Sequence, residues 1–135
     1  MAARRSYPCY SKDGFEYIDE DDGIAITSYK GIKTEIVIPK EMQIGFFEKR
    51  KKLPVVTIGW LAFSGRYLKN VVIPDSVKEI DNAAFAGNSN IKLVIPDSVK
   101  INGDLTDFGF ERYWTSGGVL TFTLFIHMYN FREFF

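Results

Sequence analysis

The chain has 135 residues, with 17 basic and 17 acidic side chains and 46% apolar residues, which predicts one globular domain rather than a disordered tail. Its zero formal net charge excludes the broad electrostatic attraction that a strongly basic chain has for nucleic acid or anionic membranes. One cysteine, Cys9, and one histidine, His127, cannot form a disulfide framework or a structural zinc site within the chain. We therefore expect no metal and no cofactor.

The first residues carry Arg4 and Arg5 but continue into Ser6–Cys9 instead of an apolar stretch. A secretory signal needs an apolar stretch after its basic residues, so none is predicted and the sequence does not encode a compartment. We expect residues 1–13 to be a flexible leader and residues 14–135 to be a single repeat domain.

A β-hairpin is predicted over residues 14–35. Two apolar segments, Phe15–Ile18 and Ile24–Tyr29, flank the acidic turn Asp19–Asp22, and Gly23 accepts the left-handed backbone conformation of such a turn. The acidic cluster invites a calcium interpretation, but it lacks the alternating ligand spacing and the distal glutamate of a calcium loop. A solvated hairpin tip is the preferred interpretation.

Internal repeats dominate the middle of the chain. The heptapeptide at Val72–Lys78 occurs again, letter for letter, at Val94–Lys100, which is an offset of 22 residues. A third copy of its first residues stands at Ile36–Pro39, one repeat plus a 13-residue insertion before Pro74. Repeats of roughly 20 to 29 residues are typical of solenoids. The repeats are predicted over residues 36–103, with an insertion at 40–53.

Each repeat contains a short strand that Pro74 or its equivalent ends, because proline cannot donate to a β-ladder. Asp75 and Ser76 then form a turn. Stacking at the repeat offset predicts three ladders of like residues in the core. These are Ile38, Ile73 and Ile95; Ile36, Val71 and Leu93; and Phe63 over Phe85.

Alternate positions of the same strands are expected to face solvent. They form two predicted columns, one of Glu35, Asn70 and Lys92 and one of Val37, Val72 and Val94. Solenoids bind proteins through such columns, so these six residues are the candidate protein-binding face.

The composition changes sharply in residues 104–135, where Phe108–Phe135 contains ten aromatic residues. Alternation within Val119–Ile126 predicts a strand, and this run is too short for a membrane span of roughly 20 residues. We expect a C-terminal cap strand that covers the last repeat. Alternatives are a dimer interface and the end of a longer repeat array. Homo-oligomerisation would use the aromatic side chains of Phe122, Phe125, Phe131, Phe134 and Phe135.

Other candidates for chemistry have plainer explanations. The basic run Lys49–Lys52 resembles a phosphate or nucleic-acid patch, but no basic stripe elsewhere supports it, so a solvated insertion loop is preferred. His127 has no nucleophile or acid nearby in a motif. Cys9 has no recognisable activating neighbour. Serines recur at the repeat turns (Ser64, Ser76 and Ser98), which indicates turn chemistry rather than a nucleophile.

The segment Ile58–Gly65, the run Leu68–Ile80 and the pair Ala84–Phe85 resemble the BspA-like leucine-rich repeats. The resemblance covers residues 14–100, although the link between Pro39 and Ile58 is longer and more basic than usual in that family. It implies a mainly β, short leucine-rich-repeat-type solenoid with an N-terminal hairpin and an aromatic C-terminal cap strand.

By the same resemblance, the function is that of a non-enzymatic protein-binding module for adhesion or surface display, at the cell surface or secreted, with a cytoplasmic location as the alternative. A structural, self-assembling repeat domain that associates through its aromatic tail is the second hypothesis. Nucleic-acid binding through Lys49–Lys52 is a third and is not favoured, and catalysis has the least support.

Overall fold

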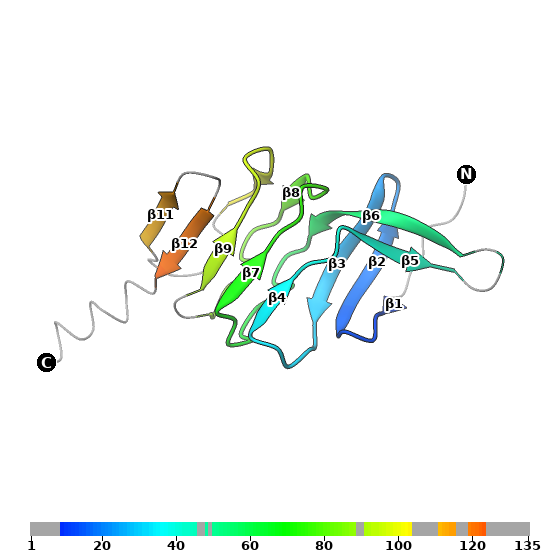
Figure 1. Cartoon of the computed structure of the whole chain (residues 1–135), viewed down its shortest axis with the longest axis horizontal. Coiled ribbons are helices and arrows are strands. Elements are labelled where there is room, and N and C mark those ends of the chain that lie inside the picture. Colours follow the sequence, from blue (N-terminus) through cyan, green and yellow to red (C-terminus); the bar gives the residue numbers. More distant parts are fainter. Residues whose placement is uncertain are drawn as a thin grey trace, which may run out of the picture.

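Two β-sheets that face each other across an apolar core make up the described part of the chain (Figure 1). The computed structural model describes residues 9–45, 48, 50–88 and 91–103, and the backbone of two further strands at 111–115 and 119–123. From β4 to β10 the chain passes repeatedly from one sheet to the other, so the molecule is a flattened coil. The predicted mainly β repeat solenoid is confirmed.

The first sheet, called sheet A, begins with the predicted N-terminal hairpin and continues through the second strand of each repeat. In spatial order its strands are β1 (Cys9–Tyr10), β2 (Phe15–Glu20), β3 (Gly23–Tyr29), β6 (Lys51–Ile58), β8 (Glu79–Ile80) and β10 (Lys100–Ile101), and β5 (Glu41–Ile44) pairs with β6. The hairpin strands β2 and β3 are antiparallel, whereas β3, β6, β8 and β10 run parallel.

The second sheet, called sheet B, contains the first strand of each repeat. Its order is β11 (Glu111–Thr115), β12 (Val119–Thr123), β9 (Lys92–Val94), β7 (Asn70–Val72) and β4 (Glu35–Val37). The parallel register places Ile36 beside Val71 and Val71 beside Leu93, as the repeat offset predicts. The amide of Ile38 donates to Val72 at 2.9 Å, and that of Ile73 donates to Val94 at 2.9 Å. The predicted stacking of the repeats in register is therefore confirmed.

An aromatic column runs through the core along the axis of the coil. The rings of Phe63 and Phe85 stack with their centroids 5.1 Å apart and their planes inclined by 14°. On the other side of Phe63, the ring centroid of Tyr29 lies 5.5 Å from that of Phe63. The ring centroid of Phe15 lies 5.3 Å from that of Tyr29. Each of these rings is at least 95% buried. The column joins the hairpin to the repeats and makes one continuous core of the two.

The repeats differ by one residue between the turn and sheet A. The turns themselves are equivalent, because Val77 donates to Pro74 and Val99 donates to Pro96, each at 3.2 Å. In sheet A, however, Lys100 pairs with Glu79 rather than with Lys78. The last repeat has one residue fewer after its turn, so Ile101 takes the place of Ile80. The letter-for-letter match through Lys100 conceals this shift.

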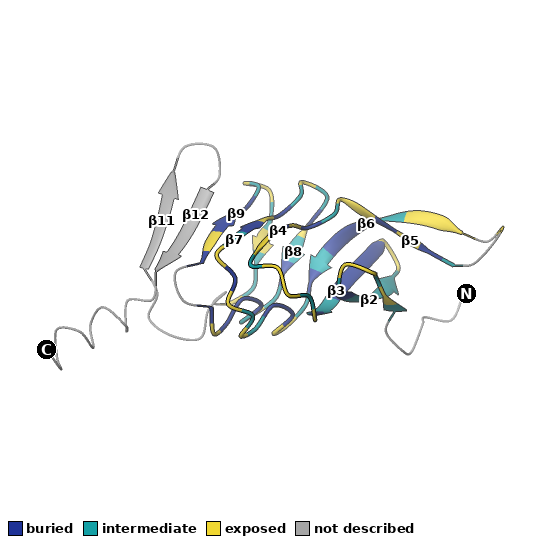
Figure 2. Ribbon diagram, turned by 60° about the horizontal axis from the view of Figure 1, so that its bottom comes forward, coloured by how far each residue is buried: buried dark blue, intermediate teal, exposed yellow. Residues whose placement is uncertain are grey.

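A solvated loop was preferred for the basic run Lys49–Lys52, but Lys51 and Lys52 lie in the strand β6. Residues 40–53 as a whole were predicted only as an insertion. They contain β5 and the start of β6, which form an antiparallel hairpin in register from Glu41 opposite Pro54 to Ile44 opposite Lys51. Met42 and Ile44 are buried and alternate with exposed residues, which is the pattern of a strand with one covered face. The C-terminal half of β6 is buried and its N-terminal half is exposed (Figure 2).

The chain joins sheet A five residues earlier than the predicted domain boundary at residue 14, because Cys9 pairs with Tyr17 and Tyr10 pairs with Glu16. At the other end β12 pairs antiparallel with β9, so that Val119 lies opposite Val94. A C-terminal strand thus covers the last repeat in sheet B, as predicted.

Candidate protein-binding surface

The outward positions of β4, β7 and β9 form two rows across sheet B. Register places Glu35 beside Asn70 and Asn70 beside Lys92, and we call these three residues the polar row. Neighbouring strands lie about 4.8 Å apart, so the row spans roughly 10 Å. The Asn70 side-chain amide donates a hydrogen bond of 3.0 Å to the Glu35 carboxylate. The row therefore carries a negative end, an amide and a positive end in fixed order.

Beside the polar row lies the valine row, formed by Val37, Val72 and Val94, which the register also aligns. The exposed fraction of the residue falls from 70% at Val37 to 36% at Val72, and Val94 is half-buried. All six residues of the candidate face are thus adjacent on one outer surface. This surface combines an apolar stripe with a charged stripe, and both come from repeat positions.

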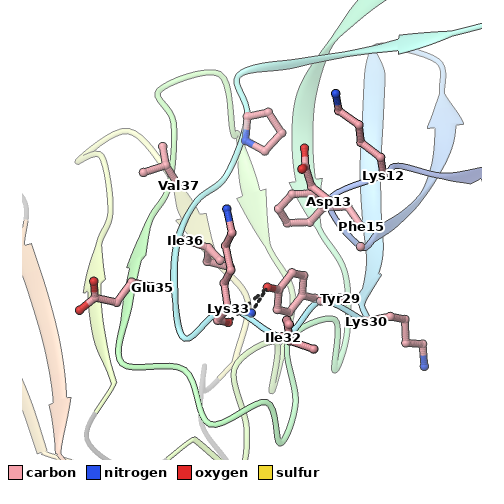
Figure 3. Close-up of a pocket in the computed structure, with 13 residues that line it drawn as sticks. Lys12, Asp13, Phe15, Tyr29, Lys30, Ile32, Lys33, Glu35, Ile36 and Val37 are labelled. Atoms are coloured by element: carbon pink, nitrogen blue, oxygen red, sulfur yellow. Dashed lines mark hydrogen bonds between the residues drawn. The ribbon is translucent and has the colours of Figure 1, made fainter.

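A hollow of about 660 Å³ adjoins this surface at the N-terminal end of sheet B, and sequence analysis did not find it (Figure 3). We call it the N-terminal hollow. One wall is the strand β4 with Pro39, and the other walls are the loops on either side of the β2–β3 hairpin. Its lining residues are Lys12, Asp13, Gly14, Phe15, Tyr29, Lys30, Gly31, Ile32, Lys33, Glu35, Ile36, Val37 and Pro39.

The hydroxyl of Tyr29 fixes the loop that leads into β4. It accepts a hydrogen bond of 3.1 Å from the Lys33 amide and donates one of 3.2 Å to the Lys33 carbonyl (Figure 3). The two loops that frame the hollow approach each other closely, because a Cβ on Gly14 would lie 2.6 Å from the backbone nitrogen of Gly31. Gly14 also has a φ of +94°. Glycine is required there, and the hollow is framed by tightly held loops.

A buried asparagine, Asn88, was also missed as a structural residue. Its side-chain amide nitrogen donates to the carbonyls of Phe63 at 2.8 Å and Phe85 at 2.9 Å. Its side-chain oxygen accepts from the amides of Arg66 at 3.1 Å and Leu68 at 3.0 Å. Asn88 is fully buried, and its hydrogen bonds connect one repeat to the next inside the core. The sequence gives no sign of this role, since a turn asparagine and a buried asparagine have the same local sequence.

The other predicted candidates lie apart from this surface. Cys9 is a free thiol in β1, on sheet A. The acidic turn holds Asp22, whose carboxylate lies 3.5 Å from the Lys78 ammonium group. The ammonium group of Lys52, in the basic run, lies 3.9 Å from the carboxylate of Glu41 across the β5–β6 hairpin. Ser76 lies in a turn, and its hydroxyl donates at 3.1 Å to the carbonyl of Lys40, 36 residues earlier in the chain.

In the described part of the chain, no three His, Cys, Asp or Glu side chains group as metal ligands would. That part likewise contains no helix with the length and apolar character needed to cross a bilayer. His127, Lys49, Phe125, Phe131, Phe134 and Phe135 lie outside the described residues, and of Phe122 only the backbone in β12 is described. Oligomerisation through the aromatic tail stays a prediction.

Several solved structures share this architecture. A leucine-rich cell surface protein from Faecalibacterium prausnitzii is 27% identical with a TM-score of 0.58, over 73% of this chain and 27% of that one. A leucine-rich repeat protein from Bacteroides ovatus is 29% identical with a TM-score of 0.53, over 67% of this chain and 24% of that one. A leucine-rich repeat protein from Bacteroides capillosus, 24% identical with a TM-score of 0.56, is matched over 72% of this chain and 88% of its own length.

These likenesses establish the leucine-rich repeat fold of the chain. The chain spans only about a quarter of the proteins from F. prausnitzii and B. ovatus, so the activities of those whole proteins do not transfer with the fold. No protein-family model and no curated protein matches the chain.

Proposed function

We propose that this leucine-rich repeat chain is a non-enzymatic protein-binding module and that the outer face of sheet B binds the partner. One observation carries the proposal. Three parallel strands present the polar row and the valine row in register, so that charged and apolar groups stand at fixed spacing on one surface. Such an arrangement recognises another protein by complementary charge and by burial of the apolar stripe.

We further propose that the module belongs to the BspA-like repeats and acts in adhesion or display at the cell surface. The likeness to a leucine-rich cell surface protein at 27% identity supports the location. Treating intact cells of the native organism with a protease tests it. Loss of the protein from intact cells is expected, and full protection until the cells are lysed would contradict surface display.

The binding face is tested by capture followed by charge reversal. The immobilised chain retains a partner from the surroundings of the native organism, and its affinity is then measured for two variants. Lys92→Glu reverses the positive end of the polar row, and we expect affinity to fall about tenfold because a rim or interface charge pair becomes repulsive. Asn70→Lys next to it is expected to weaken binding less.

Lys100→Glu is the matched control, because it makes the same charge change at an exposed residue of sheet A. It should leave affinity unchanged. Equal losses for Lys92→Glu and Lys100→Glu would mean that net charge, and not the polar row, governs binding. No loss for either Lys92→Glu or Asn70→Lys would place the partner elsewhere on the molecule.

A further inference from the structure

Sheet B ends earlier than sheet A at the N-terminal side of the coil. Each repeat supplies one strand to each sheet, as β7 and β8 do. Strand β3 pairs parallel with β6 through Ile24 opposite Val55 and Ile26 opposite Ile58, so β3 takes the sheet A position of a preceding repeat. In the described part of the chain, sheet B has no strand that matches β3 and ends at β4. The N-terminal hollow adjoins β4 where such a strand would lie (Figure 3).

The backbone of β4 offers hydrogen-bonding groups toward this hollow. The carbonyl of Thr34 accepts from Asn70 at 3.3 Å, and the amide of Ile38 donates to Val72 at 2.9 Å, so both face β7. In a parallel ladder alternate residues bond to the same neighbour. The amide and carbonyl groups of Glu35 and Val37 therefore point away from β7, along the edge that borders the hollow.

The hollow has an apolar floor and an apolar rim. Phe15 and Tyr29 lie beneath it at 4% and 1% exposure and belong to the aromatic column. Ile32 and Val37 stand at its rim at 97% and 70% exposure. Single exposed apolar residues are common, but two of them beside an unpaired strand edge and a hollow mark a place where a partner covers them.

Charge at the hollow is net positive. Lys12, Lys30 and Lys33 line it and are exposed, whereas its acidic residues are Asp13 and Glu35. The ion pairs among the described residues use other lysines. Glu35 already accepts a hydrogen bond from Asn70. A partner with negative side chains complements the three lysines, whereas a basic one does not.

We propose that an acidic, extended segment of a partner protein adds to the free edge of β4 as a further strand of sheet B, with an apolar side chain seated over Phe15 and Tyr29. This inference rests on the proposed protein-binding function and names its mode. Main-chain hydrogen bonds to Glu35 and Val37 supply affinity, and the hollow and the lysines supply selectivity. The tightly framed loops limit the entropy lost on binding.

A synthetic peptide with the sequence of residues 68–75 tests the proposal, because that segment already pairs with β4 from its other side as part of the next repeat. In the peptide Lys69 is replaced by Glu to meet the lysines, and a second peptide keeps Lys69. Binding is followed by NMR on the full chain. We expect the acidic peptide to shift the amide resonances of Glu35 and Val37 and to bind more tightly than the lysine peptide, with a preference that weakens at high salt.

Val37→Pro removes an edge donor, and proline is tolerated on edge strands. It should weaken binding of the acidic peptide about tenfold, whereas Val37→Thr keeps the amide, loses only part of the apolar side chain and should weaken binding much less. Absence of shifts at β4 with millimolar peptide, or equal binding by Val37→Pro and wild type in the folded state, overturns the proposal. So does self-association of the wild type that Val37→Pro abolishes, because the occupant would then be a second copy.

The experiments distinguish a failure of strand addition at β4 from a failure of the proposed binding face on sheet B. Lys92 lies on β9, two strands away from the hollow in sheet B. If Lys92→Glu weakens capture of the partner while the peptide leaves the amide resonances of β4 unchanged, strand addition is wrong and the proposed binding face is supported. If the peptide binds β4 while Lys92→Glu has no effect on capture, the proposed binding face is wrong and strand addition at the edge of β4 is supported.

Discussion

Phe63 and Phe85 stand 22 residues apart in sequence and stack with ring centroids 5.1 Å apart and ring planes inclined by 14°. Tyr29 continues this column toward the N-terminal hollow, where it and Phe15 form the floor. The residues that hold the repeats together therefore also shape the proposed binding site. Changes deep in the stack and changes at the surface must be separated by measuring stability beside binding.

Phe85→Ala should lower the free energy of unfolding by about 3 to 5 kcal/mol, because it empties a fully buried site in the aromatic column. Urea unfolding measures the change. Phe63→Ala should act similarly, and the double variant should reveal a coupling of about 0.5 to 1.5 kcal/mol from the stacked pair. Tyr67→Ala removes an aromatic side chain that is 84% exposed and should change stability by less than about 0.5 kcal/mol. Strictly additive losses for the two phenylalanines would contradict the stacking.

Asn88→Ala should destabilise the fold by about 2 to 4 kcal/mol, since it leaves the buried amide of Leu68 and the carbonyls of Phe63 and Phe85 without their partner. Thermal or urea unfolding reports the loss. Asn88→Asp keeps an acceptor, loses both donors and buries a carboxylate, so it should be at least as damaging at neutral pH. A loss no larger than that of Asn70→Ala, at a half-buried surface position, would show that Asn88 does not hold the repeats together.

Ala83→Gly should stabilise the protein by up to about 1 kcal/mol. Ala83 has a φ of +57°, in the left-handed region that costs an L-residue roughly 1 to 2 kcal/mol, and this relief exceeds the entropy that glycine loses on folding. Ala84→Gly next to it is the control, because Ala84 is fully buried and has no such φ, so the same change should destabilise. The melting temperatures of the two variants should move in opposite directions. A shift in the same direction would contradict the backbone strain inferred at Ala83.

The repeat offset of 22 residues was sufficient to predict the ladders, because a solenoid converts periodicity along the chain into contact across it. The strands around Ile36, Val71 and Leu93 align accordingly. The insertion was misjudged because its basic residues dominated the interpretation. The alternation of Met42 and Ile44 with polar neighbours was the signal that a hairpin lay there.

Other features had no signal in one sequence. The one-residue shift at Lys100 follows from pairing in sheet A, which the identical heptapeptides cannot reveal. The N-terminal hollow arises because the hairpin contributes β3 to sheet A and no strand to sheet B before β4. That is a difference between two sheets, and it becomes visible only when the strands are placed in space. The candidate face was predictable because alternation within a three-residue strand decides which side chains point outward.

Residue-resolved amide hydrogen exchange across β4 and β7 tests the central claim most directly, namely that the repeats stack in register and leave β4 as an open edge. The account predicts slow exchange at Ile38 and Ile73, whose amides bond to the next strand, and at Val72, which lies inside the sheet. It predicts fast exchange at Glu35 and Val37, whose amides point away from β7. Protection of Val37 equal to that of Val72 in the unbound protein would contradict it.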